Sequence, residues 1–183
     1  MALAMAGGER RQDRRAVRTR TALTQALIEL LLQRGWEAIG VGELCARADV
    51  SRSTFYLHFS NKEELLESGF AALRAAIQPA GGRRKPGGPL AFIDALAAHL
   101  YENRRAALAI IGAKGSGIVR ERFRLLLLNM IRDDLGRGRA ADHTLAHFLS
   151  GGFVALAGHL LAVKASRAGD LAEAFHSMAL PLL

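Results

Sequence analysis

Apolar residues recur at spacings of three and four along most of this 183-residue chain, which is the pattern that amphipathic helices produce. A helix beginning at Arg14 carries the clearest apolar face, made of Leu23, Ala26, Leu27, Leu30 and Leu31. The pattern predicts further helices over residues 42–48, 52–59, 62–78, 90–103, 105–113, 118–135, 142–164 and 171–180. Apolar and polar residues alternate convincingly nowhere, so no strand is predicted and the expected fold class is all-α.

The clearest break in this pattern is at residues 79–89, which read PAGGRRKPGGP and combine proline and glycine with three consecutive basic residues. We predict that this segment is a flexible connector. Residues 14–78 would form a first domain, and residues 90–183 would form a second, helical domain. Residues 1–13 are predicted to be a disordered tail, because small residues there are followed by charged ones.

Two short helices joined by a three-residue turn follow the first long helix, and this is the outline of a helix-turn-helix. Gly35 ends the long helix as a C-terminal glycine usually does, Asp49 tolerates a left-handed turn, and Ser51 caps the second short helix. In that helix, Phe55 and Phe59 lie at i and i+4 and form the buried face. The side chains left mostly outside are Arg52, Ser53, Thr54, Tyr56, Leu57 and His58.

Positive charge gathers where a DNA backbone would need it. The formal net charge of +8 favours an anionic partner such as nucleic acid. Six arginines, Arg18 among them, and two acids leave a net charge of +4 over residues 1–20. Lys62 opens the helix after the motif, where its charge and free backbone N–H groups can hold a phosphate oxygen, and Gly42 can do so through its N–H.

The segment from Gly35 to Leu66 reads GWEAIGVGELCARADVSRSTFYLHFSNKEELL and resembles the signature of the TetR family of bacterial regulators. The resemblance covers roughly residues 14–75. Two positions depart from the family pattern: Gly40 stands where the second helix usually has a Ser or Thr cap, and Asp49 stands where the turn usually has Gly. The matching features are the closing Gly35, Leu44-Cys45, the turn before Ser51, Thr54-Phe55-Tyr56, His58-Phe59 and Lys62-Glu63.

The resemblance implies a three-helix DNA-binding domain in a homodimer that reads successive major grooves of a palindromic operator in double-stranded DNA. It implies phosphate contacts from Thr54, Tyr56, His58 and Lys62. The resemblance also implies that the side chains nearest to the base edges are those of Arg52, Ser53 and Leu57. The chain would then be a cytoplasmic transcriptional repressor, released from DNA by a small-molecule or protein effector.

The second domain contains the run FLSGGFVALAGHLLAV, which is similar to a branch of TetR proteins related to dihydroxyacetone-kinase operon regulators. In that branch, the last two helices form the dimer interface as a four-helix bundle. The small residues of this run lie at helical spacing and let helices approach closely. Its apolar residues occupy most sides of the helix, so the helix needs burial on several faces. The alternative is a central core helix without dimerisation. The expected interface residues are Phe148, Gly151, Gly152, Ala155, Gly158, Leu171 and Phe175.

A pocket for an unidentified small-molecule inducer is expected between Leu90 and Leu135, as in the family generally. Core positions have the same apolar pattern, so these residues fit either role. The candidate lining residues are Phe92, Leu96, His99, Leu100, Ile111, Phe123, Leu127 and Met130.

Other chemistry is sparse in this sequence. His143 and His147 have the i, i+4 spacing of a helical metal site, but no third ligand is evident, so no metal site is predicted. Cys45 is the only cysteine, so no intrachain disulfide can form. No nucleophile–base pair or cofactor motif supports an enzyme, and no cofactor is expected.

The apolar stretch of residues 153–163 is shorter than the ~20 residues that span a bilayer, so no membrane association is expected. One alternative function is a TetR-like fold that no longer reads DNA and serves as a ligand-binding or protein-interaction module. The basic and hydroxyl residues on the predicted third helix argue against it.

Overall fold

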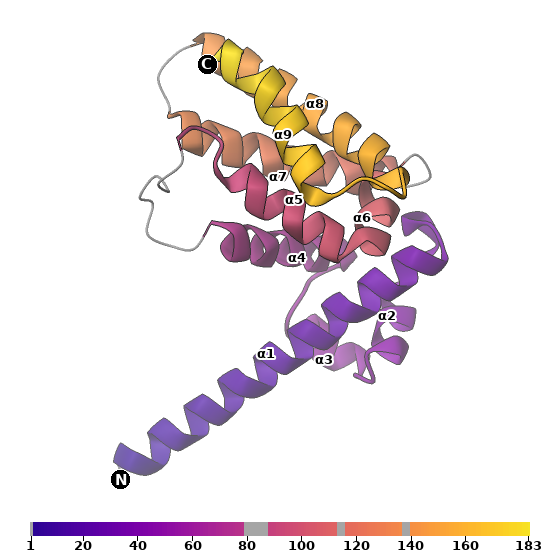
Figure 1. The fold of residues 1–183 in the computed structure, drawn as a ribbon. Helices are drawn as coiled ribbons and strands as arrows, with labels where there is room; N and C mark the ends of the chain where they lie inside the picture. The colour runs from indigo at the N-terminus through magenta and orange to yellow at the C-terminus, as the bar shows by residue number, and fades with distance from the viewer. Residues whose placement is uncertain (1, 79–87, 113–115, 137–139) are drawn as a thin grey trace. The chain divides into compact units, whose positions relative to one another are not determined.

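The computed structural model describes residues 2–78, 88–112, 116–136 and 140–183, and these ranges contain helices and no strand (Figure 1). The prediction of an all-α fold is therefore confirmed. The chain divides into two compact units, Met1–Gly69 and Phe70–Leu183. Helix α4, Lys62–Ile77, runs from the first unit into the second.

The first unit is a small helical bundle built on one long helix. Its elements are α1 (Ala2–Gln33), the short 3-10 helix η1 (Trp36–Ala38), α2 (Val41–Arg47), α3 (Arg52–Tyr56) and the start of α4. The predicted apolar face of α1 is buried except at Leu31, which is partly exposed. The core that it joins consists of Trp36, Ile39, Leu44, Cys45, Phe55, Phe59, Leu65 and Leu66.

Three boundaries differ from the predictions. Helix α1 begins at Ala2 instead of Arg14, in a stretch whose Ala, Leu, Met, Arg and Gln residues favour helix, and the disordered tail at residues 1–13 stays a prediction. Gly35 does not end α1 in a left-handed conformation, because its φ of −67° and ψ of 158° are extended. Helix α3 ends at Tyr56 instead of Phe59, since a turn follows in which the Phe55 carbonyl accepts from the N–H of His58 and of Phe59.

The second unit is a bundle in which α8 lies against three other helices. Its elements, after the end of α4, are α5 (Phe92–Glu102), α6 (Arg104–Ile111), α7 (Gly117–Leu135), α8 (Ala140–Ala162), α9 (Ala168–Ala179) and η2 (Leu180–Leu182). Helix α8 packs on α6, α7 and α9, and α5 packs on α6 and α9 (Figure 1). Aromatic pairs mark the core, with ring centroids 5.9 Å apart for Phe70 and Phe123 and 5.2 Å apart for Phe153 and Phe175.

The C-terminal end of α7 holds two segments that are distant in sequence. Arg74 of α4 forms an ion pair with Asp133, with 2.6 Å between Nη2 and Oδ2. The neighbouring Asp134 accepts a hydrogen bond of 2.7 Å from the backbone N–H of Leu90, just before α5. Most of the predicted connector, residues 79–87, lies outside the described residues.

One helix in the described part of the chain is long and apolar enough to cross a membrane, over His143–Ala162 in α8. The apolar stretch of residues 153–163 overlaps the second half of this helix, and the residues before it bring the helix to that length. Length and composition alone do not distinguish a membrane span from the central helix of a bundle, and α8 packs on three helices of its own unit. Only 39% of the segment is buried, and the large apolar side chain that it leaves exposed is Phe148.

Candidate nucleic-acid interface

The turn between α2 and α3 has the geometry that the sequence predicted. Asp49 adopts the left-handed conformation, with φ of 53°. Ser51 caps α3, because its Oγ accepts a hydrogen bond of 3.0 Å from the backbone N–H of Thr54. The Ser51 hydroxyl also lies 2.8 Å from the hydroxyls of Ser53 and Thr54, so both of these predicted DNA contacts are held at the start of α3.

The two faces of the segment that begins at α3 differ sharply in exposure. Phe55 and Phe59 are buried, with ring centroids 5.8 Å apart, and they fix the segment to the core of the first unit. Tyr56 stands edge-on to Phe55 and is 59% exposed, while Leu57 is 82% exposed. His58 is partly exposed. A large apolar side chain that this bundle leaves almost fully exposed is available to a partner.

Lys62 has a structural role that the sequence did not reveal. Its ammonium donates hydrogen bonds to the carbonyl oxygens of Trp36, at 2.8 Å, and Ile39, at 2.9 Å. It also lies 4.5 Å from the centroid of the Trp36 ring, a cation–π distance. Lys62 therefore ties the start of α4 to η1, and its contact with a phosphate stays a prediction.

Replacing Lys62 by methionine is expected to destabilise the first unit by about 1–3 kcal/mol, because two part-buried carbonyl groups lose their donor. The fluorescence of Trp36, the only tryptophan in the chain, reports urea unfolding of this unit. Glu63→Gln at the next helix position is the matched control. An unchanged midpoint for the methionine variant would mean that the two hydrogen bonds add nothing to stability.

The start of α4 is closed by reciprocal hydrogen bonds that involve Ser60, Asn61 and Glu64. Asn61 is the cap, since its Oδ1 accepts from the backbone N–H of Glu64 at 2.8 Å. The Glu64 carboxylate accepts in turn from the backbone N–H of Ser60 at 2.6 Å. This hydrogen bond lowers the pKa of Glu64, so the closure is complete at neutral pH and weakens as the pH falls through that lowered pKa.

The arginines in α1 and just after it fall into two groups. Just past its C-terminal end, Arg34 pairs with Glu43 of α2 at 2.6 Å. Nearer the N-terminus, Arg14, Arg15 and Arg18 are exposed and form no hydrogen bond or ion pair with any described residue. Arg20, between the groups, lies 5.5 Å from the Phe59 ring centroid. The unpaired arginines thus belong to the same unit as the exposed face of α3.

Residues 23–68, which hold this helix-turn-helix, match the model of a family described as "Bacterial regulatory proteins, tetR family". The helix-turn-helix of this chain is thus similar to that of TetR-family regulators. A curated relative, the uncharacterized HTH-type transcriptional regulator YxbF of Bacillus subtilis (strain 168), is 39% identical over 61 residues. That match takes in 33% of this chain but only 16% of YxbF, so the relative is a far longer protein.

Solved structures extend the likeness to the whole chain. A TetR transcriptional regulator from Streptococcus agalactiae 2603V is 22% identical, with a TM-score of 0.61 over 92% of this chain and 97% of its own. The dihydroxyacetone kinase operon activator DhaS is 18% identical, with a TM-score of 0.59 over 90% of this chain and 95% of its own. At these identities the likeness shows the fold, which in both units is that of TetR regulators.

The predicted dimer residues divide into two sets. Phe148 is 65% exposed, and Gly152 and Ala155 are exposed on the same side of α8. Leu171 and Phe175 are instead buried in the core of the second unit, because the inner face of α9 packs on α5 and α8. Their place in a dimer interface stays a prediction, since an apolar pattern is the same in a core and in an interface.

The predicted glycines of α8 also differ in role. Gly151 is partly exposed. Gly158 faces α6, and a Cβ there would lie 3.0 Å from the carbonyl oxygen of Ile111, so this glycine serves close packing inside the unit. After the end of α8, exposed apolar residues that the sequence did not single out are Val163, Met178, Leu180, Leu182 and Leu183.

The predicted pocket residues lie in the packed core of the second unit. His99 is partly exposed, and the other seven are buried. Their role in binding an effector stays a prediction. Burial in the core does not distinguish a residue that lines a pocket from one that only packs against its neighbours.

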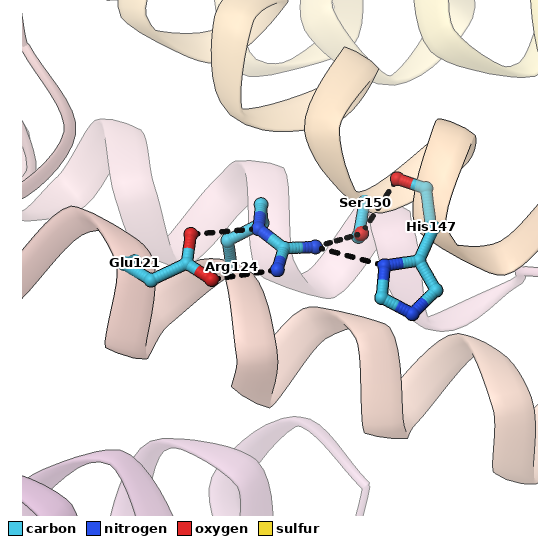
Figure 2. A network of polar contacts seen from close by, with 4 residues as sticks. All are labelled: Glu121, Arg124, His147 and Ser150. Atoms are coloured by element: carbon cyan, nitrogen blue, oxygen red, sulfur yellow. Dashed lines mark hydrogen bonds and ion pairs between the residues drawn. The ribbon is translucent and has the colours of Figure 1, made fainter.

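His147, which contacts His143 one turn earlier in α8, belongs to a polar network that joins α7 to α8. Figure 2 shows this network, which also contains Glu121, Arg124 and Ser150. Glu121 accepts two hydrogen bonds from Arg124, of 2.6 and 2.8 Å, which lower the pKa of the carboxyl. The Arg124 guanidinium reaches the buried Ser150 hydroxyl at 3.3 Å and lies 3.5 Å from Nδ1 of His147. A fixed positive charge beside this imidazole opposes a bound cation. The contacts of Arg124 with Ser150 and His147 instead tie α7 to α8.

Proposed function

We propose that this chain is a sequence-specific DNA-binding transcriptional regulator that binds a palindromic operator as a homodimer. The observation that carries the proposal is the exposed side of α3 and the turn after it, where Tyr56 and Leu57 project from a frame fixed by Phe55. The N-terminal residues of such a helix contact base edges in the major groove. Since DNA is the partner, the protein would act in the cytoplasm, and no enzymatic role is proposed.

Homodimerisation is supported by the outer side of α8. From Phe148 to Ala162, its exposed positions are spaced three and four residues apart and carry small or apolar side chains and one histidine, but no lysine, arginine, aspartate or glutamate. Such a surface is stabilised when a second copy covers it, and a two-fold dimer matches a palindromic operator. These positions are Phe148, Gly152, Ala155, His159 and Ala162, and the exposed Val163 follows the end of the helix.

The proposed direction of control is repression, in which the dimer occupies a promoter until an effector releases it. An effector would act by preferring a conformation whose α3 helices no longer match the ~34 Å between successive major grooves. Activation is the second candidate, because the similar structure DhaS is named an operon activator. A reporter gene behind the bound promoter distinguishes the two, since deleting the regulator raises expression under repression and lowers it under activation.

Selection from random duplex DNA tests the proposed function. The wild type is expected to enrich a palindrome, and anisotropy titration should give a lower affinity for Leu57→Ala, since this exposed side chain has no packing role. Tyr56→Phe removes one hydroxyl and tests its phosphate contact separately. If the wild type enriches no sequence, the chain is not a sequence-specific regulator, and a ligand- or protein-binding module replaces it.

The unpaired arginines of α1 are expected to contribute salt-dependent affinity. Each phosphate contact changes the slope of log K against log salt by about 0.9, so the variant Arg14→Ala/Arg15→Ala/Arg18→Ala should be shallower by about 2 or more per dimer. The control removes the same charge from the second unit. It is Arg105→Ala/Lys164→Ala/Arg167→Ala. Equal slopes for the two variants would show that the α1 arginines do not meet DNA.

A further inference from the structure

The first residue of α3 places its charge on α2. A Cβ built on Gly42 would lie 2.5 Å from Nη2, 3.2 Å from Cζ and 3.3 Å from Nε of Arg52. The guanidinium therefore lies against α2 in the space that a side chain at residue 42 would take. Gly42 has no left-handed conformation to explain it, so its structural contribution is this space.

Nothing else in the described part of the chain holds the Arg52 guanidinium. It forms no hydrogen bond or ion pair there, and Glu43, the next residue along α2, is paired with Arg34. Arg52 is exposed, so its N–H donors are available to an acceptor from outside. Its charge also reaches Cys45, where it opposes the increase in pKa that burial of the thiol causes.

We propose that Gly42 and Arg52 act as a pair that directs Arg52 to the DNA backbone instead of to a base. This inference rests on the proposed function and revises the assignment of Arg52 to the base edges. In a helix-turn-helix, the first helix of the motif crosses the backbone, while the second enters the groove. A guanidinium that lies on α2 is thus on the side where a phosphate passes, and a planar fork of donors suits a phosphate.

The residue at position 42 then controls where Arg52 reaches. In Gly42→Ala, the new Cβ meets only the far end of a flexible side chain, so the guanidinium moves and the backbone does not. Alanine is also the better helix former. Arg52, released from α2, becomes able to extend into the major groove, where arginine prefers guanine. A single methyl group is therefore expected to change base preference at a site that it does not touch.

The test compares the wild type, Arg52→Ala, Gly42→Ala and the double variant Gly42→Ala/Arg52→Ala on the enriched operator and on its single-base-pair variants. Arg52→Ala is expected to weaken binding to all of these sequences alike and to reduce the salt slope by about 1 per protomer. Between 50 and 200 mM salt, the wild type should lose about tenfold more affinity than this variant. Gly42→Ala should alter the preference at one base pair or more, and the double variant should lose that change.

Two results would overturn the inference. One is an Arg52→Ala variant whose salt slope is unchanged while its preference at one base pair relaxes, because Arg52 would then read a base. The other is a Gly42→Ala variant that matches the wild type in affinity, slope and preference. Trp36 fluorescence confirms that each variant is folded. If the wild type binds no preferred sequence, the proposed function fails, and that result is distinct because it appears before any substitution is made.

Discussion

Phe55→Ala is expected to unfold the first unit at temperatures at which the second unit stays folded. Phe55 is fully buried and packs against Phe59 and Tyr56, and removing such a ring costs about 3–5 kcal/mol. That is a large share of the stability of a small domain, since whole domains are stable by only about 5–15 kcal/mol. The loss should appear as an early transition in Trp36 fluorescence, followed by a separate loss of helical circular dichroism from the second unit.

The adjacent aromatic residue provides the matched control. Tyr56→Ala removes a ring that is 59% exposed and loses mainly its edge contact with Phe55, which is worth about 0.5–1.5 kcal/mol. Its unfolding should stay close to that of the wild type, while its DNA affinity falls. If Phe55→Ala and Tyr56→Ala lower the fluorescence midpoint equally, Phe55 is not the residue that anchors α3.

Ala155→Glu is expected to convert the proposed dimer to monomers. Ala155 is exposed in the middle of the uncovered side of α8, so a two-fold interface there would bury two unpaired carboxylates. Each uncompensated charge costs about 3–5 kcal/mol. The dimer dissociation constant should therefore rise at least about 100-fold, because each 1.4 kcal/mol is a factor of ten. Sedimentation velocity measures the change in mass, and operator affinity should fall with it.

Two controls separate interface from charge in this experiment. Ala155→Ser keeps a small side chain at the same site and should remain dimeric. Ala76→Glu adds the same charge at an exposed position of α4, on a different helix from the proposed interface, and should also remain dimeric. A dimer that survives Ala155→Glu at low protein concentration would show that the copies meet elsewhere.

Local patterns predicted much of the helix-turn-helix because its geometry depends on neighbours in sequence. The i, i+4 spacing identified Phe55 and Phe59 as buried, and the tolerance of Asp for positive φ placed the turn at Asp49. Contacts between distant residues left no such signal. Nothing in the sequence near Lys62 points to the carbonyl groups of Trp36 and Ile39, 26 and 23 residues away.

In the sequence, a charged or an apolar residue often fitted two structural roles, and only the packing of the folded chain distinguishes them. The family resemblance assigned Arg52 to base edges, yet its guanidinium lies against Gly42 on another helix. The apolar side chain of Leu171 is equally suited to a core and to an interface, and it proved to be buried. Phe148, which was expected at the same interface, is 65% exposed, so only the folded chain separates the two roles.

The carboxylates at the end of α7 have a practical consequence for protein engineering. Asp133 holds Arg74, and Asp134 holds the backbone of Leu90, so both sides of residues 79–87 are fastened to one helix end by side chains outside that segment. Lengthening a closed loop is cheap, about 0.6 kcal/mol for each doubling. A peptide tag or a fluorescent reporter inserted between Gly81 and Gly82 should therefore leave both anchoring contacts, and the bundle they belong to, intact.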